Sequence, residues 1–293
     1  VLIGCVGNGT AQMAYSRAVS SWFNARRGLA LAVMMCGGAI GALLLPPLAQ
    51  RLIGSIGWRG AYATLGLGVV AIGVPVVLLF VRERPRSSAG GSAVDTGATT
   101  IEGLRSLVFW VVVGVLFVAS IAQNGVLAHL AALLTDRGVS DEGAALALST
   151  MGGASLLGRP VSGWLIDRYF AARVSFGLLT LAGAGVLLLA LSPSLRAGIA
   201  AAALIGFGMG GEADVIPYLL TRYFGLRSFG MLYGFTWTVY ALAGAIGPVL
   251  MGRAFDLTGS YVSLLTMLAV ATIAAGTLML TLPRYPDTRT AAA

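Results

Sequence analysis

The sequence predicts an all-α membrane protein whose helices form two bundles, and three observations lead to this fold class. Of the 293 residues, 57% are hydrophobic and only 10% are charged, whereas soluble domains carry about 25% charged residues. Nine segments are long and apolar enough to cross the roughly 30 Å of hydrocarbon in a bilayer. One polar stretch separates three of these segments from the other six. With so little charge to cover a soluble surface, we expect a multi-pass protein embedded in a lipid bilayer.

The nine expected spans share a composition rich in Gly and Ala, which allows helices to pack closely in lipid. In chain order they are 1–19, 29–53, 61–81, 104–127, 143–166, 174–191, 197–219, 231–252 and 262–282. The stretch at 82–106, "RERPRSSAGGSAVDTGATTIEGLRS", is polar and rich in Gly, Ser and Thr. This composition predicts a loop that links two bundles.

The distribution of arginine predicts the orientation in the membrane. All 19 basic residues are arginine, and alternate connections between spans hold twelve and five of them. The richer set comprises Arg26, Arg27, Arg82, Arg84, Arg86, Arg105, Arg168, Arg173, Arg222, Arg227, Arg284 and Arg289. The positive-inside rule puts this set in the cytoplasm, together with the central loop and the C-terminus. The net charge of +8 is therefore explained by topology, and no nucleic-acid partner is expected.

An internal repeat predicts the organisation of the bundles. "GNGTAQMAYSRAVSSWF" from Gly7 and "GMGGEADVIPYLLTRYF" from Gly208 match at a shift of 201 residues. The matched pairs are Gly7 and Gly208, Gly9 and Gly210, and Phe23 and Phe224. "GAIG" recurs further on, at 38–41 and 244–247. The first span thus corresponds to the fourth span after the loop. We expect 1–81 to be spans four to six of a first bundle, truncated to three helices, and 107–293 to be a second bundle with a short tail.

The motifs resemble those of the major facilitator superfamily, in its monocarboxylate and oxalate/formate carrier branch. "WFNARRGLALAVMMCGG" at 22–38 resembles the branch signature at the start of the fifth span. "GWLIDRYF" at 163–170 resembles the second-half copy of the superfamily's cytoplasmic loop motif, and "GRP" at 158–160 resembles the Arg-Pro of the eighth span. The resemblance implies two six-helix bundles, alternating access, a monomer and a substrate site between the bundles near mid-membrane.

Two departures from the branch pattern bear on function, the first on the proton-coupling pair and the second on the substrate. The monocarboxylate pattern has an aspartate four residues before the Arg-Pro arginine, and this chain has Ser155 there. Oxalate/formate carriers have a lysine in the eleventh span, and the span at 231–252 has no positive charge before Arg253. Recognition of a dicarboxylate by two cations is therefore not expected.

Arg159 is the principal candidate for substrate binding, because it is the one charge in the span at 143–166. An arginine at the centre of a span costs about 2.5–3.5 kcal/mol on insertion scales, so water, a partner or a ligand must offset that cost. Its planar guanidinium matches a carboxylate, and Pro160 can open the helix toward a cavity. Anchoring at the cytoplasmic interface is the alternative. Arg17, with Tyr15 nearby, is a second candidate that could instead reach the cytoplasmic surface.

Two carboxyl groups lie deep in the span at 197–219. Glu212 and Asp214 are two residues apart and therefore face different sides of the helix. Either could carry a proton, with Glu212 preferred, or form an ion pair across helices. Gln123 and Asn124 are further candidates for lining the substrate site, as are Trp237 and Tyr240, which could instead pack between helices. The sole histidine, His129, is read as an interfacial residue near the outer end of its span.

Charged residues of the cytoplasmic loops are candidates for gating. Asp167 and Arg168, and the pair Arg26 and Arg27, could hold the two bundles together on the cytoplasmic side. The pair Arg26 and Arg27 could instead only set topology.

The sequence contains no enzymatic motif of the serine-hydrolase, zinc-protease or phosphate-loop type. The single histidine is too few for a histidine-based metal site, and Cys5 and Cys36 are not spaced as metal ligands. We therefore expect no enzymatic activity, no cofactor and no metal. The sequence predicts a secondary transporter of a small organic anion, coupled to protons or to exchange, in the inner membrane of a bacterium. A membrane sensor on the same fold, or an inactive fragment, remains an alternative.

Overall fold

Helices account for nearly all of the chain that the computed structural model describes, which is residues 15–16, 19–20, 22–23, 26–80 and 97–285. The helical elements are α3 (Arg27–Gly68), the π-helical turn η2 (Val69–Gly73), α4 (Val74–Phe80), α5 (Thr100–Arg105), α6 (Leu107–Thr135), α7 (Asp141–Arg168), α8 (Ala171–Leu191), α9 (Leu195–Phe224), α10 (Phe229–Thr258) and α11 (Val262–Met279). Within these residues, six helical stretches are long and apolar enough to cross a membrane. The predicted all-α membrane fold is therefore confirmed. The first expected span, 1–19, falls mostly outside the described residues.

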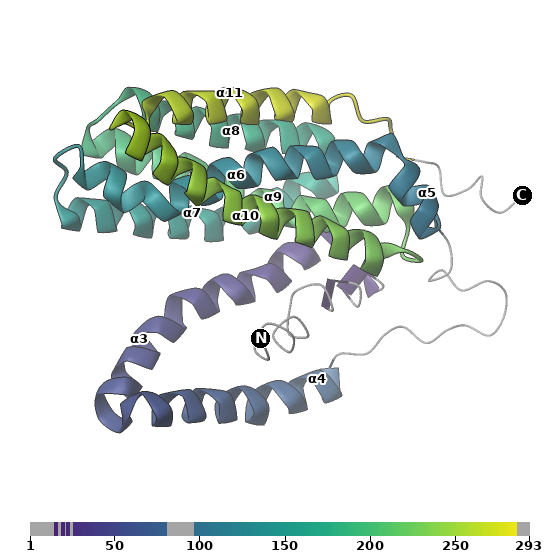
Figure 1. Cartoon of the computed structure of the whole chain (residues 1–293). Coiled ribbons are helices and arrows are strands. Elements are labelled where there is room, and N and C mark those ends of the chain that lie inside the picture. Colours follow the sequence, from purple (N-terminus) through teal and green to yellow (C-terminus); the bar gives the residue numbers. More distant parts are fainter. Residues whose placement is uncertain (1–14, 17–18, 21, 24–25, 81–96, 286–293) are drawn as a thin grey trace, which may run out of the picture.

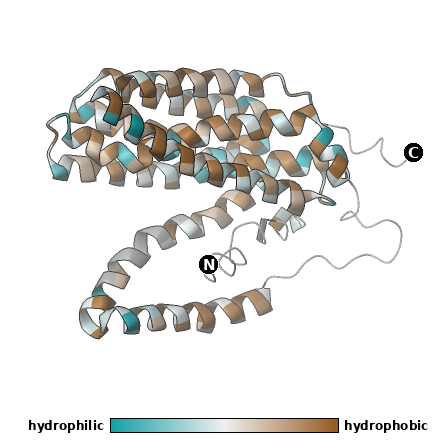
Figure 2. Cartoon of the chain, in the orientation of Figure 1, coloured by the Kyte–Doolittle hydropathy of each residue, from teal (hydrophilic) through white to brown (hydrophobic). Residues whose placement is uncertain are grey.

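The helices α6 to α11 form one bundle, which occupies the upper part of Figure 1. Within it, α7 packs against α9, α9 against α8, α8 against α11, α11 against α6, and α6 against α10. Brown, apolar residues cover most of the helices, and teal residues gather near the helix ends (Figure 2). This distribution is expected where the outer surface of a bundle faces lipid.

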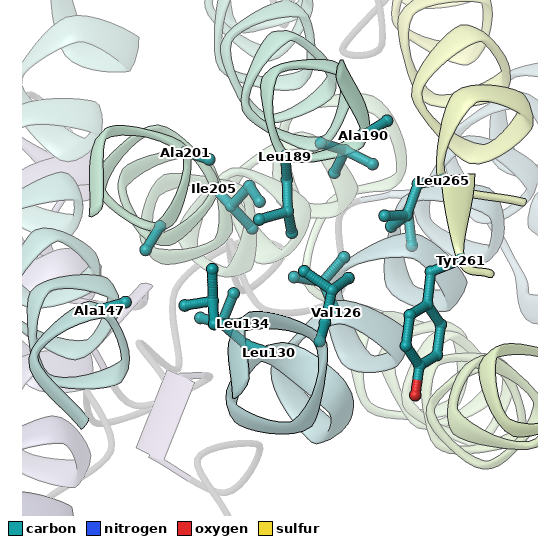
Figure 3. Packing of buried hydrophobic residues seen from close by; sticks show 14 of the residues in the cluster. Val126, Leu130, Leu134, Ala147, Leu189, Ala190, Ala201, Ile205, Tyr261 and Leu265 are labelled. Atoms are coloured by element: carbon teal, nitrogen blue, oxygen red, sulfur yellow. The ribbon is translucent and has the colours of Figure 1, made fainter. Parts of the chain in front are cut away.

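The largest buried cluster lies where α6, α7, α8, α9, α10 and α11 meet. Leu130 and Leu134 of α6 lie among Leu189 of α8, Ile205 of α9 and Leu265 of α11 (Figure 3). All five side chains are fully buried. This core packs the six helices of the bundle together.

Glycine allows two helix pairs within the bundle to come into backbone contact. On α7 and α9, a Cβ at Gly206 would clash with the carbonyl oxygen of Met151, and one at Gly210 with that of Ser155. On α6 and α10, a Cβ at Gly247 would clash with the carbonyl oxygen of Ile121. These seams join α7 to α9 and α6 to α10.

The spans expected at 29–53 and 61–81 differ from the observed helices. Helix α3 runs from Arg27 to Gly68, and its one non-helical residue is Gly57, which has φ 73° and ψ 167°. Glycine tolerates this positive φ without strain, so the chain reverses there in a very short turn. Figure 1 shows the result, in which α3 leaves the bundle and α4 returns in a second arm. The first arm packs on α7 and α9.

The stretch expected to be a loop at 82–106 contains a short helix, α5, in its described part. Thr99 caps this helix, because the Thr99 hydroxyl accepts from the Glu102 amide at 3.3 Å and the Glu102 carboxylate accepts from the Thr99 amide at 2.6 Å. The Thr99 amide holds the pKa of Glu102 below its ordinary value. The capping box explains why a Gly- and Thr-rich segment is helical here. The Gly, Ser and Thr content of this stretch predicted a loop, because composition does not take account of the capping box.

Candidate functional site

A cavity of about 160 Å³ lies inside the bundle, between α6, α7, α9 and α10. Its lining residues are Leu116, Gln123, Ser155, Arg159, Met209, Glu212, Ile216, Tyr233, Thr236, Trp237 and Tyr240. Five of the residues singled out from the sequence are therefore part of one site: Gln123, Arg159, Glu212, Trp237 and Tyr240. The volume is sufficient for several water molecules or a small organic molecule.

Arg159 forms an ion pair with Asp214 beside the cavity. The Arg159 Nη1 atom donates to the Asp214 Oδ1 atom at 3.3 Å, joining α7 to α9. The Asp214 side chain is fully buried, whereas 15% of the Arg159 side chain is exposed. Within the described residues, Arg159 Nε and Asp214 Oδ2 are buried without a hydrogen-bond partner. The pair thus keeps unused hydrogen-bonding capacity at the edge of a cavity, where a ligand could use it.

Glu212 is held by a different partner, on the other side of the site. The Gln123 Nε2 atom of α6 donates to the Glu212 Oε2 atom at 2.6 Å. The two carboxyl groups of α9 therefore face different neighbours, as their spacing predicted. Helices α6 and α9 otherwise have few contacts with each other. This hydrogen bond therefore directly links the helix pair α6 and α10 to the helix pair α7 and α9.

Helix α10 supplies an aromatic wall. Tyr233 and Trp237 meet edge to face with ring centroids 6.3 Å apart, and Trp237 and Tyr240 meet at 5.0 Å. These positions are one helical turn apart, so all three rings fall on the face of α10 that lines the cavity. Tyr233 was not identified from the sequence, although its spacing of four from Trp237 was a signal that could have revealed it.

The other lining residues missed by sequence reasoning are Leu116, Met209, Ile216 and Thr236, together with Ser155, which was noted only as a departure from the family pattern. Apolar residues and a threonine in an apolar helix look the same whether they face a cavity or a neighbouring helix. Only the packing of the four helices distinguishes these two positions.

Some expected site residues are not in the lining of this cavity. Asn124 donates from Nδ2 to the backbone oxygen of Ser120 at 2.9 Å, and it lies within hydrogen-bonding reach of Tyr240. It therefore lies close to an aromatic residue of the cavity. Tyr15 is half-buried and is not among the lining residues, and Arg17 lies outside the described residues.

Asp167 joins the bundle to α3 at the end expected to face the cytoplasm. Its Oδ1 accepts from the Gly28 amide at 2.8 Å, and its Oδ2 accepts from the Leu29 amide at 2.9 Å. A carboxylate at a helix N-terminus satisfies free amide groups and interacts favourably with the helix dipole. Close approach is possible because Gly163 of α7 lies against Gly28, where a Cβ on either residue would clash.

The arginines near this contact have separate partners. The guanidinium of Arg168 lies 4.0 Å from the centroid of the Trp164 ring, so Arg168 covers an aromatic side chain of its own helix. The Arg27 Nε donates to the Phe23 backbone oxygen at 3.1 Å, and Arg27 also interacts electrostatically with Asp167. Arg26 is exposed in the turn before α3.

Comparison with known families agrees with this architecture. A family model described as Major Facilitator Superfamily matches residues 1–248 of the chain. The chain belongs to the Major Facilitator Superfamily. This result confirms the resemblance seen in the motifs at 22–38, 158–160 and 163–170.

Curated relatives of this superfamily member include several monocarboxylate transporters. It is 29% identical to monocarboxylate transporter 11 of Mus musculus over 259 residues, covering 83% of this chain and 56% of that protein. It is 28% identical to monocarboxylate transporter 13 of Bos taurus over 275 residues, covering 91% and 62%. The chain spans 56% and 62% of the length of these two relatives. The similarity agrees with the monocarboxylate-like branch indicated by the motifs.

Solved structures share the fold of this superfamily member. The Escherichia coli fucose:proton symporter FucP matches with a TM-score of 0.75 at 17% sequence identity, over 94% of this chain and 74% of that chain. A second FucP structure, described as being in the outward conformation, matches with a TM-score of 0.71 at 18% identity, over 92% and 72%. At this identity the likeness concerns the arrangement of helices alone.

Proposed function

We propose that the protein is a secondary active transporter of a small organic anion that works by alternating access, with coupling to protons or to exchange. The observation that carries this proposal is the ion pair of Arg159 and Asp214 at the edge of the cavity. A buried ion pair stabilises a fold weakly, because desolvation offsets most of its attraction. Its presence within a membrane bundle therefore favours a role in binding.

Arg159 is the proposed ligand for the substrate carboxylate. It lines the cavity and its guanidinium retains donors that Asp214 does not occupy. Guanidinium and carboxylate groups match in shape and charge, and hydrogen bonds between ionised groups are about twice as strong as neutral ones. The names of the relatives in the monocarboxylate transporter group support a carboxylate as the anion.

Asp214 is the proposed proton carrier, with Glu212 as the second candidate. This order reverses the preference drawn from the sequence, because Asp214 contacts Arg159 directly and Glu212 contacts neutral Gln123. An ionised Asp214 competes with a substrate carboxylate for the same guanidinium. When Asp214 takes up a proton, Arg159 becomes available to the substrate, which couples the two binding events.

The contact of Asp167 with the first turn of α3 is the proposed cytoplasmic gate. It joins the second bundle to a helix of the first, and it must break for the two to separate at this end. Arg27 supports the contact electrostatically. Arg168 and Arg26 would contribute positive charge near the cytoplasmic surface of the membrane. We further propose that the protein is a monomer in a bacterial inner membrane, with its C-terminus in the cytoplasm.

The test replaces Arg159 with alanine in the full-length protein reconstituted into proteoliposomes. We expect carboxylate counterflow to fall by at least about 30-fold, because truncating one partner of a buried, hydrogen-bonded charge pair costs roughly 2–5 kcal/mol of binding free energy. The matched control is Arg173→Ala, which removes an exposed arginine from the first turn of α8. Normal counterflow by Arg159→Ala, with correct insertion, would refute the assignment.

A further inference from the structure

The two carboxyl groups of α9 differ in how they meet the cavity. Asp214 is fully buried, and its nearest charged group is Arg159. Glu212 lines the cavity and is 9% exposed. One carboxyl group thus lies behind the arginine, while the other faces the space that a ligand would occupy.

Glu212 has no cationic partner among the described residues that line the cavity. Arg159 is the one cation in that lining, and Asp214 already pairs with it. The hydrogen bond from Gln123 is from a neutral amide and satisfies one Glu212 oxygen. An ionised carboxylate in a buried site is costly unless a positive charge compensates it. Since none of the described lining residues supplies this positive charge, we infer that it comes from a proton or from the ligand.

The aromatic wall suits a positively charged ligand group. Tyr233, Trp237 and Tyr240 line the same cavity as Glu212. Tyr240 also lies within electrostatic range of both Glu212 and Arg159. Ammonium groups bind favourably over the faces of aromatic rings. The cavity therefore combines a carboxyl group and aromatic rings, which suit an ammonium, with a guanidinium, which suits a carboxylate.

We propose that the substrate is a zwitterion, an amino acid whose carboxylate binds Arg159 and whose ammonium group binds Glu212. This inference rests on the proposed function and specifies its substrate class. Leu116, Met209 and Ile216 add apolar surface to the lining, beside the hydroxyl groups of Ser155 and Thr236, so we expect a largely apolar side chain on the amino acid. Gln123 is a positioning residue, which holds the Glu212 carboxylate toward the cavity.

Charge balance connects this assignment to proton coupling. A simple carboxylate substrate brings one negative charge, and Glu212 must then be neutralised by a proton. An amino acid brings its own positive charge, so Glu212 can stay ionised while the total charge of the occupied site is the same. The ammonium group of the ligand replaces the proton on Glu212.

The test measures binding of matched pairs that differ only in the amino group. The probes are L-alanine and propanoate, L-leucine and 4-methylpentanoate, and L-phenylalanine and 3-phenylpropanoate, each assayed by calorimetry with the purified full-length protein at neutral pH. For at least one pair we expect the amino acid to bind about 10-fold or more tightly than its deaminated partner, as a charge-assisted hydrogen bond permits.

Two variants separate this inference from the proposed function. In Glu212→Gln, the preference for the amino acid should disappear, while binding of the deaminated acid should persist and show that the site is folded. Arg159→Ala should lose both members of each pair. Glu142→Gln, which changes an exposed glutamate in the first turn of α7, is the matched control and should keep the wild-type preference.

Three outcomes would overturn the inference. If the wild-type protein binds each deaminated acid as tightly as its amino acid, the substrate is a simple carboxylate and the proposed function stands alone. If Glu212→Gln retains the preference, the ammonium group binds elsewhere. If no member of any pair binds, both the substrate class and the proposed carboxylate transport are wrong.

Discussion

At the scale of single residues, three side chains of α7 and α9 define the chemistry of the cavity. Arg159 and Asp214 form a charged pair, and Glu212 faces the cavity beside them. The sequence identified all three, because placing a charged side chain inside an apolar helix costs free energy, so such residues are rare and easily recognised. It could not assign partners, because residues 55 positions apart are joined only by the packing of two helices.

Asp214→Asn should separate substrate binding from its pH dependence. A neutral amide cannot compete with the substrate as a carboxylate does, and it cannot take up a proton. We expect tighter binding of a carboxylate substrate, together with uptake that no longer rises as the external pH falls from about 7.5 to 5.5, because the variant has no carboxyl group to protonate at this position. Initial rates in proteoliposomes at fixed internal pH measure both effects.

The control for this change is Asp256→Asn, which alters an exposed carboxylate at the end of α10 and should leave the pH profile unchanged. A wild-type pH profile in Asp214→Asn would show that Asp214 does not carry the proton.

At the scale of helices, the seam between α7 and α9 positions the charged pair. Gly206 and Gly210 allow α9 to lie directly against the backbone of α7, at Met151 and Ser155. Asp214 follows Gly210 by about one turn, and Arg159 follows Ser155 by the same distance. The close contact of the glycines therefore brings the two side chains within hydrogen-bonding distance.

Gly210→Ala should destabilise the bundle, although alanine is the better helix former. The added Cβ would clash with the Ser155 carbonyl oxygen, and overpacking of this kind costs about 1–3 kcal/mol. The gain in helix propensity is about 1 kcal/mol. We expect a lower thermal unfolding midpoint in detergent.

Gly177→Ala is the matched control, because this glycine of α8 has no neighbouring atom within 4 Å of its added Cβ. Its unfolding midpoint should stay the same or rise. A rise of equal size in both variants would contradict the close contact between α7 and α9.

At the scale of the whole molecule, α3 reaches the second bundle at one end and diverges from it at the other (Figure 1). Asp167, Gly28 and Gly163 form the contact where the two come together. Cys36 lies further along α3 and is near enough to Arg159 and Asp214 to interact with them electrostatically. The contact of Asp167 and the pair of Arg159 and Asp214 are therefore both close to α3.

Asp167→Ala should increase the access of reagents to Cys36. Loss of a carboxylate that caps a helix costs about 0.5–2 kcal/mol, and each 1 kcal/mol changes a conformational population about five-fold. We expect Cys36 to react with a maleimide about five-fold faster in this variant, measured by mass spectrometry in a Cys5→Ser background.

Asp141→Ala removes an exposed carboxylate at the opposite end of α7 and should leave the rate unchanged. An unaltered rate in Asp167→Ala would mean that this contact does not hold the interface closed.

The amino-acid sequence alone determined that this chain is helical, lies in a membrane and belongs to a transporter superfamily. It could do so because lipid allows very few structures to span a membrane. Composition and the length of apolar runs are therefore nearly sufficient to predict the fold class. Its local motifs also identified the arginine and the two carboxyl groups.

Only the tertiary structure decided which of these groups meet. Asp214 pairs with Arg159, Glu212 pairs with Gln123, and Tyr233 joins the aromatic wall. The Thr99 capping box and the reversal at Gly57 likewise became evident only from backbone geometry. Apolar helices have similar residues on every face, so the pattern along the chain does not reveal which face lines a cavity. That choice depends on close glycine contacts between helices, which bring distant residues together.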